Sequence, residues 1–81
     1  MARPSIDAVP YAVAQRLRMV DLLLHLYGHV NRAALVEVFG ISVPQASMDF
    51  RNYLRCAPGN ARYDRQTRRY VRCAEFERLY P

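Results

Sequence analysis

The stretch formed by residues 41–55 constrains the fold more than any other part of this 81-residue chain. Ser42 is suited to cap the first turn of a helix, and Gln45, three residues later, can complete a capping box with it. Pro44 falls in that first turn, where its missing N–H removes no hydrogen bond. This marked start predicts a helix over residues 42–55.

The two sides of this predicted helix differ in chemistry. Ala46, Phe50 and Tyr53 recur at helical spacing and are expected to face a core. The other side carries amides, guanidiniums and a thioether, on Gln45, Met48, Arg51, Asn52 and Arg55. A small helix that buries one face and shows such groups on the other suits the major groove of DNA. We interpret it as a recognition helix.

Positive charge is concentrated in the C-terminal part of the chain. The net charge is +5; residues 1–50 hold four Arg and four acidic residues, whereas residues 51–81 hold eight Arg and three acidic residues. A segregated basic region is the pattern of a surface that binds a polyanion. A GC-rich genome would explain why every basic residue is Arg, but it does not explain the segregation.

Composition also limits the class of protein. A chain of this length makes one domain at most and buries roughly 60–65% of its unfolded surface. A hydrophobic content of 52% argues against disorder. The chain has no apolar run of membrane-spanning length and no signal-peptide pattern, so we expect a cytoplasmic protein that does not enter a membrane.

The sequence predicts neither a metal site nor an active site. Cys56 and Cys73 lack His partners at ligand spacing and are expected to be reduced thiols. His25 and His29 are four residues apart, but Gly28 should break the helix between them. We find no nucleophile beside a base, no paired carboxylates and no glycine-rich phosphate loop, so we expect no enzyme and no cofactor.

A first helix is expected over residues 11–27, after a tail of residues 1–10 and before Gly28, which favours a left-handed helix end. Its apolar residues fall in two stripes that leave a narrow polar face of Arg18, Asp21 and His25. An apolar arc this broad exceeds the need of a three-helix core. Either other elements wrap it, or part of it docks on a partner, which could be a second copy or another domain.

A second helix is expected over residues 32–39, with Asn31 as its cap and Gly40 at its end. Its inward face is predicted to be Leu35, Val38 and Phe39. Two helices joined by a short turn that contains Gly make the helix-turn-helix pattern. Small Ala46 would let the two helices approach closely.

A β-hairpin is expected after the loop at residues 57–60. Its strands are predicted at residues 62–64 and 69–72, around a basic tip at residues 65–68. Three helices followed by such a hairpin make a winged helix-turn-helix, which is mainly α with a small β-hairpin. The hairpin tyrosines, Tyr63 and Tyr70, are expected to pack against the recognition helix rather than to stack on bases.

The domain is expected to occupy residues 11–73. Residues 74–81 are predicted to begin a linker to an effector domain, with Phe76 and Leu79 as possible anchors.

Several short motifs resemble the N-terminal domain of one regulator family. They are Gly28-His29-Val30-Asn31-Arg32, Phe39-Gly40-Ile41-Ser42, Gln45-Ala46-Ser47-Met48-Asp49 and Ala57-Pro58-Gly59-Asn60, with Tyr53, Tyr63-Asp64 and Tyr70. They resemble the WYL-domain transcriptional repressors encoded beside bacterial phage-defence systems such as BREX and CBASS. The likeness covers residues 15–76.

The resemblance implies a winged helix that binds palindromic operator DNA as a homodimer, followed by a ligand-sensing WYL domain and a C-terminal dimerisation domain. The sequence departs from the family pattern at Tyr27, near where Trp is common, and at Ala61, where a larger apolar residue is usual. The chain also stops at Pro81, before any WYL domain. Ligand sensing and much of the dimerisation are therefore not carried over to it.

The residue types suggest separate roles in DNA binding. Base contacts are predicted for Gln45, Met48, Arg51 and Asn52. An amide pairs with adenine and a guanidinium with guanine, each good pair being worth roughly 1–3 kcal/mol of discrimination, and Met48 could touch a thymine methyl. Backbone contacts are predicted for Ser42, Ser47, Arg32, Arg55, Arg65, Arg68 and Arg69. Asp49 would repel DNA and is expected to pair with an arginine such as Arg32.

The sequence thus predicts a sequence-specific binding domain for double-stranded DNA from a bacterial transcriptional repressor of phage-defence genes. The helix at residues 42–55 would enter the major groove, and the hairpin at residues 62–72 would lie on the flanking backbone. Two alternatives remain open. One is a protein-interaction module that uses the apolar face of the first helix, and the other is a nonspecific nucleic-acid binder that uses only its arginines.

Overall fold

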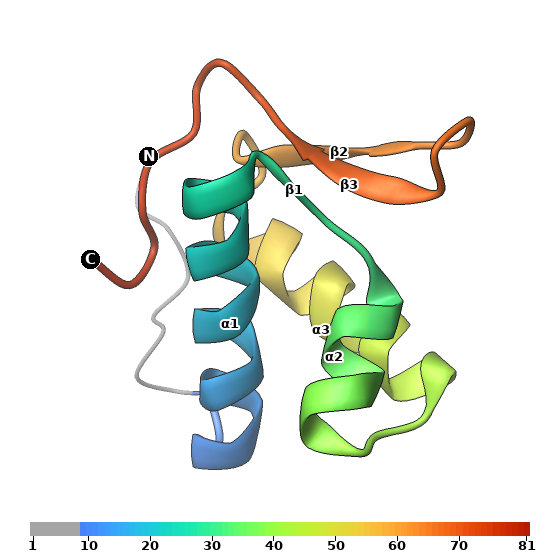
Figure 1. The fold of residues 1–81 in the computed structure, drawn as a ribbon. Coiled ribbons are helices and arrows are strands. Elements are labelled where there is room, and N and C mark those ends of the chain that lie inside the picture. The colour runs from blue at the N-terminus through green and yellow to red at the C-terminus, as the bar shows by residue number, and fades with distance from the viewer. Residues whose placement is uncertain (1–8) are drawn as a thin grey trace.

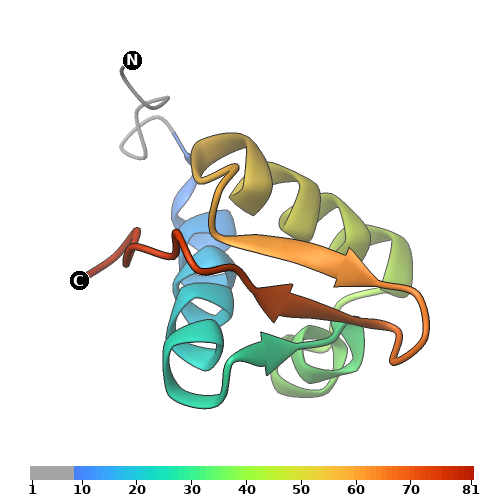
Figure 2. The same ribbon diagram turned by 90° about the horizontal axis from the view of Figure 1, so that it is seen from above.

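The computed structural model describes residues 9–81, which form three helices packed beneath a small three-stranded sheet (Figures 1 and 2). In chain order the elements are α1 (Tyr11–Tyr27), β1 (His29–Val30), α2 (Arg32–Phe39), α3 (Val43–Cys56), β2 (Ala61–Asp64) and β3 (Arg69–Arg72). This arrangement confirms the expected winged helix-turn-helix fold. The predicted tail, residues 1–10, lies outside the described residues except for its last two.

Two glycines end helices in the left-handed conformation, as the sequence predicted. Gly28 has φ 79° after α1, and Gly40 has φ 65° after α2. A residue with a Cβ is strained in this conformation, so glycine is the favoured helix end. The short turn at residues 40–42 leads directly into α3.

Side-chain caps start the second and third helices. The Asn31 side chain accepts a hydrogen bond from the Ala34 N–H at 3.1 Å, and Ser42 accepts one from the Gln45 N–H at 3.2 Å. Both caps confirm the predictions. The predicted capping box is not completed, however, because the Gln45 side chain donates to Asp49 instead of returning to Ser42.

The core lies where the helices meet. Ala46, Phe50 and Tyr53 on α3 are at most 1% exposed, which confirms the predicted inward face. The other helices contribute the fully buried residues Leu17, Val20, Leu24 and Leu35.

Val38, which was predicted to face inward, is exposed, and so is Tyr27 at the end of α1. Val38 is 58% exposed, and Tyr27 is 66% exposed. The side of α2 that faces the core carries Leu35, Val36 and Phe39. Successive residues of a helix are turned by about 100°, so Val38 points away from that side. Tyr27 is the last residue of α1.

The sheet has strand order β1-β3-β2, with both pairings antiparallel. The hairpin of β2 and β3 confirms the prediction, although β2 begins one residue earlier than expected, at Ala61. At its tip Asp64 accepts hydrogen bonds from the Thr67 hydroxyl at 2.8 Å and the Gln66 N–H at 3.0 Å. These bonds hold the pKa of Asp64 below its usual value and fix the shape of the turn.

Asp21 is fully buried, and the prediction that it lies on a polar face of α1 is wrong. The C-terminal segment runs beside α1 (Figure 1), and its backbone reaches Asp21. Asp21 accepts hydrogen bonds from the Tyr53 hydroxyl at 2.6 Å, from Arg78 Nε at 2.9 Å, and from the backbone N–H groups of Leu79 and Tyr80, each at 2.9 Å. Burial alone would raise the pKa of Asp21, but these bonds outweigh it and lower the pKa.

Asn60 extends this network to the loop after α3. Its amide donates to the Tyr53 hydroxyl at 2.9 Å and to the Glu77 carbonyl at 2.7 Å, and its oxygen accepts from the Glu77 N–H at 3.0 Å. Leu79, an expected anchor, is 7% exposed. Residues 74–81 are thus packed as far as Tyr80, while their role as the start of a linker stays a prediction.

Candidate nucleic-acid interface

The outer face of α3 is a ridge of three exposed residues. Met48 is 45% exposed, and Arg51 and Arg55 are also exposed. Gln45 and Asn52, seven residues apart, are half-buried on one flank of this ridge. Of the predicted base contacts, the structure therefore places Met48 and Arg51 at the centre of the exposed face, and the two amides at its edge.

The flank next to α1 is organised by Asp49. This carboxylate is fully buried and accepts hydrogen bonds from Arg16 Nε at 2.6 Å and Nη2 at 3.2 Å, and from Gln45 Nε2 at 3.1 Å. The prediction that Asp49 pairs with an arginine is confirmed, but the partner is Arg16 and not Arg32, the partner that the sequence suggested. Asp49 lies on the side of α3 that faces α1, whereas Arg32 approaches the opposite flank.

The flank next to α2 brings together two of the predicted backbone contacts. Arg32 Nη1 donates to the Ser47 hydroxyl at 2.9 Å. This bond places a guanidinium beside the first turns of α3. The N-terminus of a helix presents unpaired N–H groups and a partial positive charge, so the same region favours an anion.

The hairpin is fixed to α3 by aromatic packing. The rings of Tyr70 and Phe50 stack with their centroids 4.1 Å apart, and Tyr63 meets Tyr70 edge-on at 5.0 Å. The contact confirms that Tyr70 packs against the helix, whereas Tyr63 contacts Tyr70 within the hairpin and is 40% exposed. Burial raises the pKa of Tyr70, and the positive charges of Arg32 and Arg51 partly oppose that rise, so both arginines act on the Tyr70 hydroxyl.

The hairpin tip lies on the same side of the molecule as the N-terminal end of α3, away from the C-terminal segment (Figures 1 and 2). Arg65 and Arg68 are exposed at this tip, and Arg69 is half-buried. Arg68 adopts φ 56°, an uncommon conformation for a residue other than glycine. The structure therefore brings the arginine tip of the hairpin and the N-terminal end of α3 to one side of the molecule.

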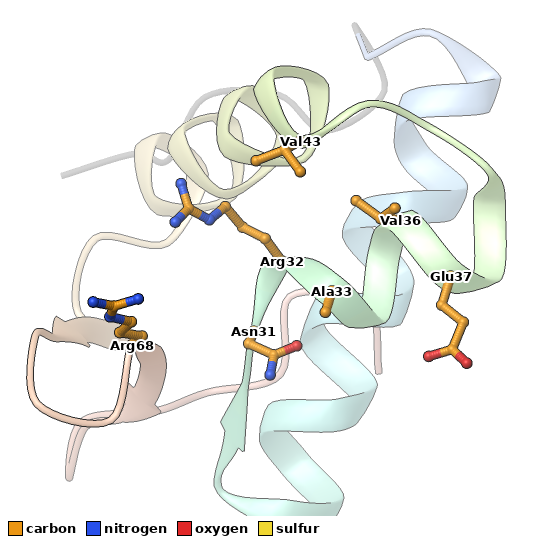
Figure 3. A pocket seen from close by; sticks show the side chains of 7 residues that line it. All are labelled: Asn31, Arg32, Ala33, Val36, Glu37, Val43 and Arg68. Atoms are coloured by element: carbon orange, nitrogen blue, oxygen red, sulfur yellow. The ribbon is translucent and has the colours of Figure 1, made fainter.

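A depression of about 500 Å³ lies between α2, the start of α3 and the hairpin tip (Figure 3). It is lined by Asn31, Arg32, Ala33, Val36, Glu37, Val43 and Arg68. Arg32 and Arg68 extend on one side of it from different elements, while Glu37 projects at the other end (Figure 3). The two guanidiniums give the end nearest the hairpin a positive charge.

Other arginines serve the fold, which the sequence did not indicate. Arg72 Nη1 donates to the carbonyls of Leu24 and His25 at 3.2 and 2.9 Å, and thereby caps the end of α1. Arg78 pairs with Asp21, and the Arg18 guanidinium lies 4.9 Å from the centre of the Tyr80 ring. Part of the basic excess after residue 50 is thus structural. The sequence held no signal for Arg72, because the carbonyls that it binds lie 47 and 48 positions away along the chain.

Within residues 9–81, no group of three or more His, Cys, Asp or Glu side chains is placed to hold a metal ion. His25 instead stacks on Phe76, with ring centroids 6.4 Å apart. Cys56 is buried and Cys73 half-buried, and neither forms a disulfide. None of the helices in this part of the chain combines the length and apolar character needed to cross a membrane.

A helix-turn-helix with an arginine-tipped hairpin packed on its second helix defines the class of winged helix-turn-helix domains. The family model described as the BrxR transcriptional regulator winged helix-turn-helix domain matches residues 12–80, and the chain belongs to this family. The family expected from the sequence motifs is thereby confirmed.

The chain is also similar to proteins named DNA-binding transcriptional repressor CapW. It is 42% identical to the protein from Escherichia coli (strain KTE188) over 66 residues, which cover 82% of this chain and 22% of that protein. It is 40% identical to the Pseudomonas aeruginosa protein over 67 residues (83% and 22%) and to the Stenotrophomonas maltophilia protein over 63 residues (78% and 21%). The chain thus spans about a fifth of the length of these relatives.

Proposed function

We propose that this chain is the DNA-binding domain of a bacterial transcriptional repressor and binds double-stranded DNA sequence-specifically. The observation that carries the proposal is that the arginine tip of the hairpin lies on the same side as the N-terminal end of α3, where Arg68 and Val43 line one depression. This helix is also the one that exposes Met48, Arg51 and Arg55. Asp49, the acidic residue of α3, is buried and paired with Arg16, so its charge is balanced within the fold. The names of the relatives, which are DNA-binding transcriptional repressors, support the same function.

In this proposal α3 enters the major groove. Met48 and Arg51 would contact base edges from the centre of the ridge, with Arg51 suited to guanine and Met48 to a thymine methyl. Gln45 and Asn52 would contact bases from the flank. The amides are half-buried, so their reach is limited to bases close to the helix.

The backbone would be held at both edges of the groove. Arg32 and Ser47, which are bonded to each other, and Arg68, on the same side of the depression as Arg32, would contact phosphates of one strand. The other proposed phosphate contacts are Ser42, Arg55, Arg65 and Arg69. These contacts set the register of the protein on DNA, while sequence is read by α3.

For the whole protein we propose a homodimer on a palindromic operator, with a WYL domain following the winged helix and phage-defence genes as the regulated targets. We assign the chain no catalytic activity and no cofactor, and we place it in the cytoplasm. One observation favours a second candidate function: Leu26 and Tyr27 on α1 are 57% and 66% exposed. This face could serve protein interaction in place of DNA binding.

A mobility-shift titration at two salt concentrations tests the proposal. The duplexes are the region upstream of the chain's own gene and a scrambled version of it. We expect a preference for the upstream duplex and, if about five phosphates are neutralised, a log–log salt slope near −4 to −5. Arg51→Ala should remove roughly 1–3 kcal/mol of that preference. Arg18→Ala is the control: it also removes one positive charge, but beside the C-terminal segment, and it should leave the preference for the upstream duplex unchanged.

The two alternatives give different results. Equal and salt-sensitive shifts with both duplexes indicate a nonspecific binder. No shift with either duplex indicates the interaction module.

A further inference from the structure

One carboxylate connects the helix core to an amide on the proposed DNA-binding face. Asp49 is fully buried, and Arg16 grips it with two donors, Nε on Oδ2 and Nη2 on Oδ1. The side chain of Arg16 is itself only 12% exposed. Hydrogen bonds between a guanidinium and a carboxylate in this forked arrangement are strong and directional. Asp49 is therefore held in one orientation by α1.

The same carboxylate determines which end of the Gln45 amide faces inward. Asp49 Oδ1 accepts a hydrogen bond from Gln45 Nε2 at 3.1 Å. An ionised carboxylate can only accept, so the amide nitrogen must face Asp49 and the amide oxygen must face away. Without such a neighbour, a glutamine amide can present either its oxygen or its nitrogen to a ligand.

The groups of the amide that remain match one base. After one N–H is given to Asp49, Gln45 keeps its oxygen and a second N–H. In the major groove, adenine presents a donor, N6–H, beside an acceptor, N7, and an amide pairs with both. An amide held in one orientation favours this pattern over bases that present two acceptors or a lone donor.

We propose that Asp49, held by Arg16, is a positioning residue that orients the Gln45 amide so that α3 selects adenine at one base position. This inference rests on the proposed function, because it specifies how the same surface reads DNA. Arg16 and Asp49 lie within the fold and act through Gln45. The sequence contained a local signal for the contact, since Gln45 and Asp49 are four residues apart on a helix.

Selection from a pool of duplexes with a randomised centre tests the proposal. The full chain is compared with Gln45→Ala, Asp49→Asn and, as a matched control on the same helix, Arg51→Ala. An asparagine can offer either oxygen or nitrogen to Gln45, so Asp49→Asn releases the amide. We expect the unchanged chain to prefer adenine at one position by roughly tenfold or more. Gln45→Ala and Asp49→Asn should flatten that position alone, and Arg51→Ala should flatten a different one.

A second measurement does not depend on whether the Asp49 variant folds. In the unchanged chain without DNA, the ¹⁵N relaxation of the Gln45 side-chain NH₂ group should be as restrained as that of the α3 backbone. A freely mobile Gln45 amide would overturn the proposal.

The selection also separates this proposal from the function on which it rests. If Gln45→Ala alters no position, or if folded Asp49→Asn keeps the adenine preference, the positioning role is overturned. The position that depends on Arg51 would then still support sequence-specific binding. If the unchanged chain selects no motif, both proposals are overturned.

Discussion

Asp21 on α1 and Asp49 on α3 are both fully buried and both paired with an arginine, yet they connect different parts of the molecule. Asp21 binds Tyr53 and the backbone of the C-terminal segment, all within the fold. Asp49 binds Gln45, which lies at the edge of the exposed face of α3. Two carboxylates with equal burial and equal charge pairing thus differ in their remaining partners. Besides its arginine, Asp21 binds groups that hold the fold together, whereas Asp49 binds Gln45, which we propose contacts DNA.

The largest expected effect is on stability at the Asp21 site. Asp21→Asn removes the charge that Arg78 and two backbone N–H groups need, and it should lower the free energy of unfolding by about 3–5 kcal/mol. Urea denaturation followed by circular dichroism measures this loss. Glu75→Gln, an exposed change of the same chemistry, is the control and should have almost no effect. A loss for Asp21→Asn as small as that of the control would show that the network is not needed.

A smaller effect is expected for Tyr53→Phe, which leaves the ring in the core. The change removes the hydroxyl that donates to Asp21 and accepts from Asn60, so two buried polar groups lose a partner. The free energy of unfolding should fall by about 1–3 kcal/mol. Tyr63→Phe serves as the control, because Tyr63 is 40% exposed, and it should be close to neutral. Equal stability of the two variants would contradict the account of the Asp21 site.

Acid should weaken the fold through Asp21. Its pKa is lowered in the folded chain, so its contribution to stability is present above its unfolded pKa of about 3.9 and is lost as the pH falls through the lower folded pKa. Below about pH 4, one such group adds at most about 1.4 kcal/mol per pH unit to the slope of stability against pH. The slope should be shallower in Asp21→Asn than in the unchanged chain. Parallel slopes would mean that the lowered pKa of Asp21 does not contribute.

The smallest expected effect is a change in the salt slope of DNA binding, and it should differ between two arginines of the same basic region of the sequence. Arg68→Ala, at the hairpin tip, should reduce the salt slope of DNA binding by about 0.9 and leave the urea midpoint unchanged. Arg78→Ala, on Asp21, should do the reverse and lower the urea midpoint without changing the salt slope. If both variants change the same quantity, the division between a structural and a DNA-binding set of arginines is wrong.

The elements that were predicted correctly depend on local signals. Asn31, Ser42, Gly28 and Gly40 define helix ends through contacts within a few residues, and the hairpin follows from strand and turn residues that are adjacent in sequence. Partners far apart in sequence could not be predicted in this way. Asp21 accepts a hydrogen bond from the N–H of Leu79, which lies 58 positions further along the chain. The periodicity of α1 does not reveal this partner, so it predicted a polar face for Asp21.

The candidate site shows the same division. The exposure of Met48 and Arg51 follows from the helical spacing of α3 and agrees with the structure. The pairing of Asp49 depends on how α1 crosses α3, which the spacing does not fix. The partner of Asp49 is therefore Arg16, 33 positions earlier in the sequence, and not the suggested Arg32. Charge counts also could not separate Arg72 and Arg78 from the arginines that remain exposed.

The central claim is that one side of the molecule contacts DNA while the Asp21 site supports the fold from elsewhere. An NMR titration of the ¹⁵N-labelled chain with a duplex from upstream of its own gene tests it most directly. We expect the largest amide shifts at residues 45–52 and 65–69, with those of Asn60 and Leu79 nearly unchanged. Shifts concentrated on the exposed face of α1 and on the C-terminal segment, with α3 and the hairpin tip unaffected, would contradict the account.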